Sequence, residues 1–276
     1  MDKLLFGVSG LPLGNGQKFD YASGISYLKD FGLDAMELLF VRSVNVSDRN
    51  KDTILRNKLA NNFYLSAHGS YYINLNAETP DKQEQSIKRI LDAVEAVRKV
   101  RSRSLIFHPG FYLNASRDKT YRTIRDNLSR LPHNGIDYRL ETTGKPTQFG
   151  TLEELVSLCQ EVGSCKLCID FAHIHARTNG SLKGYDDFVR ILRYVSEKLG
   201  RRALDDLHIH MGGIAYNGKG EKNHLPLEES DFKYVDCLRA LKDFNVKGCL
   251  ICEGPRVEND ALLLKRTFER LARSFS

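Results

Sequence analysis

Residues 79–110 read TPDKQEQSIKRILDAVEAVRKVRSRSLIFHPG and contain the repeating unit that decides the fold. The stretch begins with Thr79-Pro80, a typical helix start, because proline fits the first helical position. Apolar residues then recur at the spacing of one helix face: Ile87, Ile90, Leu91, Val94 and Val97. An apolar run of strand length, Ser104–His108, follows this pattern. The stretch therefore predicts a helix followed by a strand.

The same alternation of helix and strand continues through the chain. Seven further strands are predicted: Leu4–Ser9, Ala35–Phe40, Tyr64–His68, Tyr138–Thr142, Lys166–Phe171, Leu207–Met211 and Gly248–Glu253. Helical patterns lie near residues 22–31, 48–61, 118–131, 185–199, 231–243 and 259–273, and a capping box opens another at Thr151. Strict alternation implies parallel strands. Eight such units in 276 residues fit a single (β/α)8 TIM barrel of the α/β class, with residues 1–276 as one domain.

The alternative to a barrel is an open, doubly wound sheet. That fold usually carries a glycine-rich phosphate loop, G-x-G-x-x-G, directly after its first strand. Residues 10–16 follow the first predicted strand and are rich in glycine, but they contain Pro12 and do not match this pattern. The barrel is therefore the preferred prediction.

The composition is that of a globular protein, with 41% hydrophobic and 28% charged residues. No apolar run approaches the ~18–20 residues that span a bilayer, so we expect no membrane contact. The first residues lack the features of a signal peptide, which predicts a cytoplasmic protein. The 41 lysines and arginines exceed the 35 aspartates and glutamates, giving a net charge of +6 that permits a polyanionic partner without requiring one. Nothing in the sequence indicates an obligate protein partner.

Two pairs of cysteines, Cys165/Cys168 and Cys249/Cys252, have the spacing found in zinc ribbons. Both pairs lie in predicted strands, where residues i and i+3 point to opposite faces. Neither pair is then able to hold one ion, and we expect all four to be small buried hydrophobic residues. An inter-strand disulfide is the alternative.

Six consecutive predicted strands, the third to the eighth, carry a histidine or an acidic residue at their carboxyl ends. In order these residues are His68, His108, Glu141, Asp170 with His173, His210 and Glu253, and His224 follows the seventh strand. A barrel brings these ends into one bowl. Removing so many imidazoles and carboxylates from water without partners would cost free energy. Divalent cations bound between them would supply those partners. Mixed histidine and carboxylate ligands suit zinc, and also manganese or iron.

Three other histidines are expected to have no such role. His208 lies two residues before His210, so it should face the same side one layer deeper in the barrel and serve packing or support. His133 and His175 are interpreted as loop or structural residues.

The motifs around these residues resemble those of the endonuclease IV family, metal-dependent enzymes that cut DNA at abasic sites during base-excision repair on a xylose-isomerase-like barrel. The matching stretches are AHGSYYINL at 67–75, FHPG at 107–110 and CIDFAH at 168–173, together with Glu141, His210 and Glu253. The resemblance covers essentially the whole chain. It implies hydrolysis of the phosphodiester on the 5′ side of an abasic site in double-stranded DNA.

The resemblance also implies how the ions would be held. It assigns one ion to His68, His108 and Glu141, and a second to Glu141, Asp170, His210 and Glu253, with Glu141 as the bridging catalytic residue. A third ion would need His173 and an Asp-x-His motif after the seventh strand. His224 fits that motif, but Lys222 stands at the aspartate position, and a charged lysine cannot bind a cation. We expect two tightly held Zn²⁺ ions, with Mn²⁺ or Fe²⁺ as alternatives. The third site should be empty, weak or completed by Glu221 or Glu228.

Contacts to DNA are expected from loops on the same face. By resemblance, Tyr71 and Tyr72 would push into the base stack, where opening the duplex costs least at a missing base. Arg42, Lys219 and Lys222 are the expected phosphate contacts.

Two other functions are alternatives. Glu141, Asp170, His210 and Glu253 alone would form the one-metal site of a sugar isomerase or epimerase on the same barrel, although His68 and His108 argue against it. A non-catalytic protein that binds damaged DNA is the other alternative, supported only by Lys222.

Overall fold

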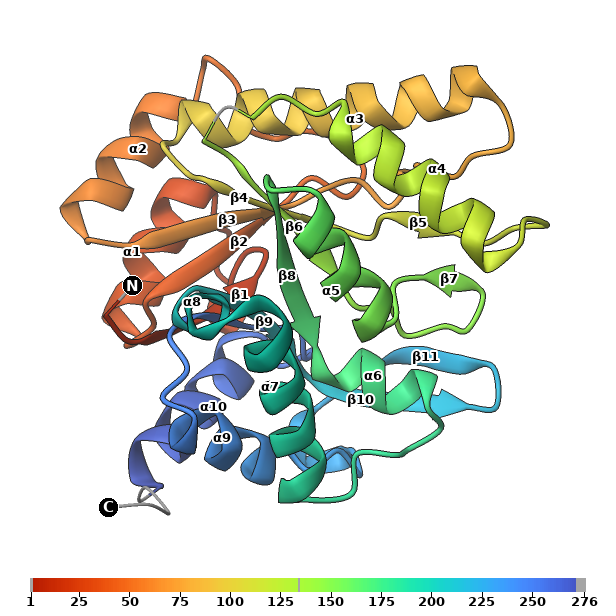
Figure 1. The fold of residues 1–276 in the computed structure, drawn as a ribbon. Helices are drawn as coiled ribbons and strands as arrows, with labels where there is room; N and C mark the ends of the chain where they lie inside the picture. Colours follow the sequence, from red (N-terminus) through yellow and green to blue (C-terminus); the bar gives the residue numbers. More distant parts are fainter. Residues whose placement is uncertain (1, 134, 272–276) are drawn as a thin grey trace.

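The predicted strands form a closed, parallel, eight-stranded barrel in the computed structural model, which describes residues 2–133 and 135–271 (Figure 1). They are β1 (Leu4–Ser9), β2 (Ala35–Leu39), β3 (Tyr64–His68), β4 (Ser104–Phe107), β6 (Asp137–Glu141), β8 (Cys165–Asp170), β9 (Leu207–Met211) and β12 (Gly248–Cys252). The barrel closes because β1 pairs with both β2 and β12. Each strand lies within one residue of its predicted bounds, and the (β/α)8 TIM barrel is confirmed.

Helices surround the barrel between its strands. They are α1 (Tyr21–Asp30), α2 (Lys51–Ala60), α3 (Pro80–Lys99), α4 (Arg117–Ser129), α5 (Leu152–Glu161), α7 (Tyr185–Leu199), α8 (Arg201–Asp205), α9 (Tyr234–Asp243) and α10 (Glu258–Arg270). Thr79 caps α3 as predicted, since its side chain accepts a hydrogen bond from the backbone nitrogen of Lys82. The predicted apolar face of α3 supplies buried side chains to the core, except for Leu91, which is 38% exposed.

Several short elements that the sequence analysis did not predict lie near the carboxyl ends of the barrel strands. They are α6 (Phe171–Arg177), the two-stranded sheet of β5 (Gly110–Phe111) and β7 (Gln148–Phe149), the hairpin of β10 (Gly213–Asn217) and β11 (Gly220–Leu225), and the 3-10 turns η1 (Gly14–Gly16) and η2 (Leu227–Glu229). Figure 1 shows β5, β7, α6 and the β10–β11 hairpin on one side of the barrel. These elements form part of the rim around the strand ends.

The interior of the barrel holds polar side chains as well as apolar ones. At the amino end, the buried Arg139 guanidinium donates hydrogen bonds to Ser104 Oγ and to the backbone and side chain of Asp206. All six cysteines lie in the described part of the chain and are free. The four cysteines of the two spaced pairs are buried, which confirms their prediction as small hydrophobic residues and excludes the disulfide.

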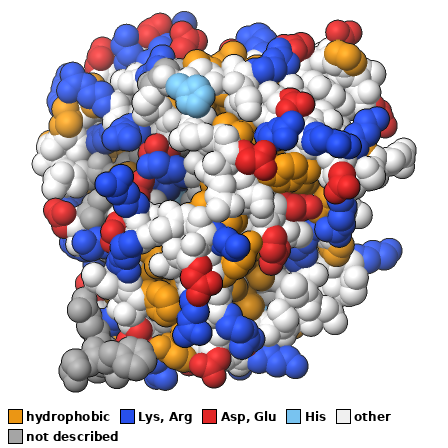
Figure 2. All heavy atoms as spheres, viewed as in Figure 1, with side chains coloured by type: hydrophobic (Ala, Val, Ile, Leu, Met, Phe, Trp, Pro, Cys, Tyr) orange, Lys and Arg blue, Asp and Glu red, His pale blue; other side chains and the backbone are white. Residues whose placement is uncertain are grey.

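The outer surface gives no sign of a bilayer-crossing segment or of one dominant charge. Within the described residues, none of the helices combines the length and the apolar character that a bilayer crossing requires. Figure 2 shows lysine and arginine side chains interspersed with aspartate and glutamate over the face in view. The net charge of +6 is therefore not gathered into one basic patch on that face.

Candidate metal centre

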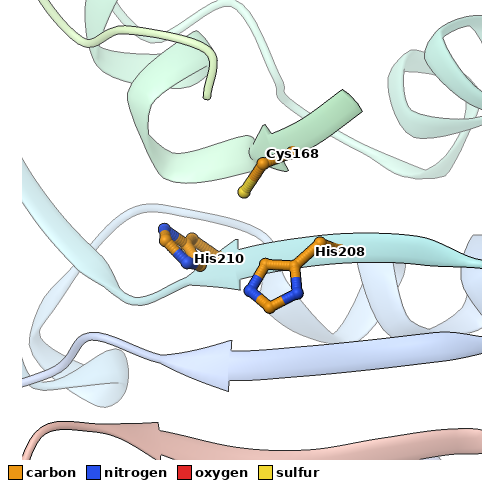
Figure 3. A group of neighbouring side chains, drawn as sticks. All are labelled: Cys168, His208 and His210. Carbon is orange, nitrogen blue, oxygen red and sulfur yellow. The ribbon is translucent and has the colours of Figure 1, made fainter. Parts of the chain in front are cut away.

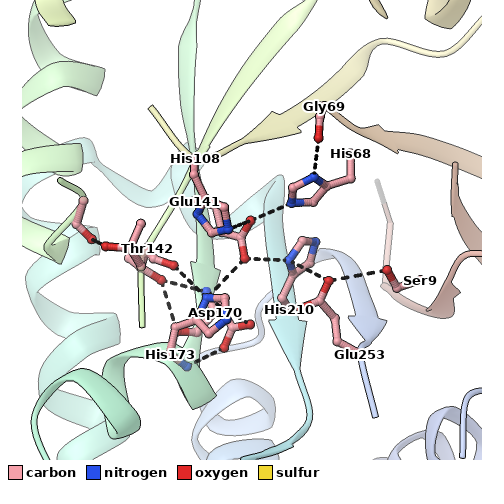
Figure 4. A network of polar contacts seen from close by, with 12 residues as sticks. Ser9, His68, Gly69, His108, Glu141, Thr142, Asp170, His173, His210 and Glu253 are labelled. Carbon is pink, nitrogen blue, oxygen red and sulfur yellow. Dashed lines mark hydrogen bonds and ion pairs between the residues drawn. The ribbon is translucent and has the colours of Figure 1, made fainter. Parts of the chain in front are cut away.

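A cavity of about 280 Å³ opens at the carboxyl ends of the barrel strands. Its lining includes six of the eight predicted metal ligands: His68, His108, Glu141, His173, His224 and Glu253. The other two, Asp170 and His210, are buried directly beside them (Figure 4). The structure thus brings all eight predicted ligands into one cluster.

Glu141 lies in the middle of this cluster, at the last residue of β6. Its Oε2 lies 2.9 Å from His68 Nε2 and 3.4 Å from His108 Nε2. Its Oε1 lies 3.1 Å from His210 Nδ1 and 3.3 Å from His173 Nδ1. Each carboxylate oxygen faces a different pair of imidazoles, so Glu141 is placed to bridge two ions.

Asp170 also positions a second candidate ligand, His173, because it ends β8 and caps α6. Its Oδ1 accepts a hydrogen bond from the backbone nitrogen of His173 at 2.7 Å. This cap places His173 in the first turn of α6, with its Nδ1 3.5 Å from Asp170 Oδ2. The sequence pattern of an acidic residue and a histidine three positions later thus has a local structural cause.

In two imidazoles a backbone oxygen faces Nδ1, so that in the neutral ring the lone pair lies on Nε2, toward the candidate ligands. His68 Nδ1 lies 2.9 Å from the backbone oxygen of Gly69, and His173 Nδ1 lies 3.0 Å from that of Thr142. Because a carbonyl oxygen only accepts hydrogen bonds, the proton belongs on Nδ1 in both rings. Nε2 of each is then free to bind a cation, an arrangement found for most histidines that bind metals.

The charged groups of the centre shift one another's pKa values. Burial opposes charge on His68, but the Glu141 carboxylate outweighs it and raises the pKa of His68 to about 9. Burial lowers the pKa of His108 to about 4. Burial also opposes charge on Glu141, yet His108 and His210 hold the pKa of its carboxyl well below the usual value. Glu141 is therefore an ionised, buried carboxylate.

These residues fit divalent cations. Among the groups of donors whose ligand atoms lie within 4.8 Å of one another are two that share Glu141. One is His68, His108 and Glu141, and the other is Glu141, Asp170, His210 and Glu253. Buried Asp170 Oδ2 has no hydrogen-bond partner among residues 2–133 and 135–271. Buried polar atoms are rarely left without a partner, and an ion would supply one. These two groups match the ligand sets that the resemblance implies.

A third group of donors contains His173, His224 and Glu221. Glu221 Oε2 lies 3.6 Å from His173 Nε2. The expected acidic position was Lys222, but β11 contains a bulge. Ala215 pairs with Asn223 while the next residue, Tyr216, pairs with Glu221, so Lys222 is the extra residue.

The bulge changes which side chains of β11 share a face. In a regular strand Lys222 would lie on the same face as His224, but the inserted residue brings Glu221 there instead. Lys222 is exposed, and Glu228 points elsewhere, since its Oε2 lies 3.2 Å from Arg256. Of the two substitutes considered, Glu221 is the one that joins the third group.

Gly144 leaves the space that this third group needs. A Cβ atom at Gly144 would lie 2.5 Å from Glu221 Oε2 and 3.1 Å from His173 Cδ2. The backbone oxygen of Gly144 also accepts a hydrogen bond from the Glu221 nitrogen at 3.0 Å. The loop after β6 therefore anchors the hairpin that carries Glu221.

Comparison with known proteins places the fold in a family. The sequence model described as xylose isomerase-like TIM barrel matches residues 25–274. The chain belongs to the xylose isomerase-like TIM barrel family. A Methanocaldococcus jannaschii protein named Uncharacterized protein MJ0133 is 40% identical over 274 residues, which cover 97% of this chain and 98% of that one. A probable endonuclease 4 of Staphylococcus carnosus is 26% identical over 154 residues, which cover 53% of this chain and 51% of that protein.

Solved structures with this fold include different enzymes. Endonuclease IV from Thermus thermophilus aligns with a TM-score of 0.71 and 20% identity, covering 96% of this chain and 97% of that one. A D-tagatose 3-epimerase-like protein aligns with a TM-score of 0.72 and 18% identity, covering 96% of both chains. Likeness at these identities shows the fold alone.

The residues predicted to contact DNA lie on loops around the cavity. Tyr71, which lines it, and Tyr72 are 61% and 66% exposed. Arg42, Lys219 and Lys222 are exposed on the loop after β2 and on the β10–β11 hairpin. Lys145, which the sequence analysis missed, also lines the cavity. Its only sequence signal is its position four residues after Glu141, in the loop that follows β6.

The remaining histidines have the structural surroundings predicted for them. His175 is buried in α6, with its Nε2 3.2 Å from Asp231 Oδ1, and His133 is exposed outside the helices and strands. His208 is buried below the centre, where its Nε2 lies 2.9 Å from Oε2 of Glu37. Glu37 is a further residue that the sequence analysis missed. Its signal is a single charge within the apolar strand Ala35–Phe40.

The third group gives a prediction for Glu221. Glu221→Gln should lower the number of tightly bound ions by one, because the neutral amide is a poorer ligand than the carboxylate. Metal analysis after exhaustive dialysis measures this number. Glu228→Gln, one loop further along, is the matched control and should keep the wild-type count. An unchanged count in Glu221→Gln would exclude Glu221 as a ligand.

Proposed function

We propose that this chain is a metal-dependent endonuclease that hydrolyses the phosphodiester on the 5′ side of an abasic site in double-stranded DNA. The observation that carries this proposal is the set of three donor groups around one cavity, two of them sharing Glu141. A phosphoryl displacement needs positive charge on both the attacking and the leaving oxygen. A centre with several ions places positive charge at both oxygens, and a single ion does so less effectively.

The metal ions, Zn²⁺ on this proposal, would act as Lewis acids and provide a nucleophilic hydroxide at neutral pH. The side chains have separate tasks. Glu141 holds two ligand groups together and offers acceptor oxygens that orient a water molecule. Lys145 places an ammonium group at the cavity, where it neutralises phosphate charge in the bound substrate.

Several features of the cavity rim support duplex DNA as the substrate. The Tyr71 ring lies with its centroid 5.8 Å from that of His68, so a base pair opened by Tyr71 would lie directly above the centre. Arg89 lies over the Tyr72 ring at 6.0 Å from its centroid. Arginine and lysine side chains of the rim supply phosphate contacts, which dominate the affinity of proteins for DNA.

Tyr71→Ala should weaken binding to an abasic duplex while leaving the metal content unchanged. Loss of one base-stacking aromatic side chain costs about 1–3 kcal/mol, roughly a 5- to 150-fold rise in Kd. Fluorescence anisotropy with a labelled abasic duplex measures the change. Leu59→Ala removes an exposed apolar side chain on α2 and is the control. A fall in metal content in Tyr71→Ala would instead identify Tyr71 as a support for His68.

A sugar epimerase is the second candidate. One observation favours it: the four-residue group Glu141, Asp170, His210 and Glu253 is sufficient for one ion. His68 and His108 count against this candidate, because a one-metal centre has no use for two further imidazoles on Glu141.

One experiment separates the two candidates. The metal-loaded protein is incubated with a duplex that carries one abasic analogue, with the intact duplex, and with a ketohexose. We expect a nick on the 5′ side of the analogue only, and its loss on addition of a chelator. Epimerised sugar together with an uncut abasic duplex would overturn the endonuclease proposal.

A further inference from the structure

Glu37 is a carboxylate in the middle of the barrel, one layer below the candidate metal centre. It lies in β2 and is fully buried, with 0% of its surface exposed. A buried carboxylate without partners would be strongly disfavoured, so its contacts indicate why it is there.

Each oxygen of Glu37 has its own partners. Oε2 accepts a hydrogen bond from Ser66 Oγ at 2.8 Å and lies 2.9 Å from His208 Nε2. Oε1 lies 3.0 Å from His210 Nε2, an ion-pair distance, although the angle departs from that of an ideal hydrogen bond. The Ser66 and His208 contacts fix the orientation of the carboxylate, and this leaves Oε1 beside His210.

The contact between Glu37 and His210 determines which ring nitrogen carries the proton. An ionised carboxylate only accepts hydrogen bonds, so the proton of the neutral ring belongs on Nε2, beside Glu37. His210 Nδ1 is then an open lone pair, 3.1 Å from Glu141 Oε1 and 3.5 Å from Glu253 Oε1. Backbone oxygens do the same for His68 and His173, but the buried ring of His210 depends on a side chain.

We propose that Glu37 is a positioning residue that holds His210 in the orientation and tautomer in which Nδ1 binds a cation. The inference rests on the metal centre of the proposed function but not on the reaction. Partners of this kind typically change metal affinity by 10- to 100-fold when they are removed.

A metal ion bound below the centre is an alternative explanation for this cluster, and the experiment has to distinguish it from a positioning role of Glu37. Ligand atoms of Cys168, His208 and His210 lie within 4.8 Å of one another, and Figure 3 shows the Cys168 sulfur directed toward His210. An ion bound there would need Cys168. Glu37 lies 2.9 Å from His208 Nε2 and 3.0 Å from His210 Nε2, and an ion bound there would have to displace these contacts.

The test uses three substitutions that separate the charge of the residue 37 side chain from its length. Glu37→Met removes every acceptor, Glu37→Asp keeps the charge but shortens the side chain, and Glu37→Gln keeps the length and one acceptor oxygen. That oxygen is able to face His210, because His208 Nδ1 has no partner within the described chain and the His208 ring is free to move its proton there. Zn²⁺ affinity is measured by competition with a chromophoric chelator, and the Co²⁺ absorption spectrum reports the ligand geometry.

We expect Glu37→Met and Glu37→Asp to weaken one bound ion by about 10- to 100-fold and to change the Co²⁺ spectrum. Glu37→Gln should bind that ion within about threefold of wild type, since the tautomer of His210 is kept. Glu37→Asp is the safer variant for folding, and its result alone suffices to reject the proposal. Glu258→Met removes another buried carboxylate, which accepts hydrogen bonds from Leu13 and Gly14, and should leave every ion in place.

Four results would overturn the proposal. They are wild-type affinity in Glu37→Asp, tighter binding by Glu37→Asp than by Glu37→Gln, an equal loss of metal in Glu258→Met, and loss of an ion in Cys168→Ser. Because DNA is absent from these titrations, failure to cut an abasic duplex would refute the proposed function and leave this result standing.

Discussion

Glu141→Gln is expected to leave the barrel folded and to reduce cleavage of an abasic duplex by at least about 100-fold. Losses of this size follow the removal of one electrostatic contact to a transition state. Glu141 is in contact with four imidazoles, two through each oxygen. An amide of the same shape carries no charge and has only one oxygen, so it bridges two ions poorly. Single-turnover nicking with excess enzyme measures the rate.

Glu153→Gln is the matched control for this experiment, because Glu153 is exposed on α5 and away from the centre. It should cleave at the wild-type rate. Circular dichroism on both variants tests whether the barrel is intact. More than a tenth of wild-type activity in Glu141→Gln would contradict the bridging role.

Removal of the ions is expected to abolish cleavage and to lower the melting temperature by at least about 5 °C. A ligand present at 100 times its Kd stabilises the folded state by about 2.7 kcal/mol, and each kcal/mol shifts the Tm of a protein of this size by roughly 2–4 °C. The fall in melting temperature should be larger if more than one ion leaves. Thermal unfolding before and after chelation, with activity measured on the same samples, tests this.

Restoring Zn²⁺, Mn²⁺ or Fe²⁺ in separate samples completes that experiment. At least one of them should recover both activity and melting temperature. Cleavage that survives in the presence of a chelator, with metal analysis showing no remaining ion, would refute a metal-dependent reaction.

The barrel and the positions of most candidate metal ligands were predictable because both depend on local patterns. Strand and helix periodicity decided the architecture, and parallel strands in a barrel bring their carboxyl ends together whatever the loops do. Residues such as His108 and Asp170 directly follow or end a strand, so their position in the bowl follows from the strand bounds.

The choice of Glu221 over Glu228 as the substitute for the Lys222 position was not predictable in the same way. The resemblance places the acidic residue two positions before His224, whereas one bulged residue of β11 brings Glu221, three positions before His224, to that face. The bulge depends on the pairing of β10 with β11, and on the contact of the hairpin with Gly144, neither of which leaves a periodic signal.

Glu37 was missed for a different reason. The predicted ligands lie at or after strand ends, whereas Glu37 lies in the middle of β2 and contacts His210. A lone carboxylate in a strand that is otherwise apolar is itself a signal, since such a group is buried only when something pairs with it.

The most direct test of the central claim is the number of ions that one chain holds. The protein is loaded with Zn²⁺, dialysed exhaustively, and analysed by inductively coupled plasma mass spectrometry against an accurate protein concentration. The account predicts three ions per chain, one for each donor group at the cavity, and two in Glu221→Gln. A single ion per chain in the wild type, as a sugar epimerase centre would hold, would contradict it.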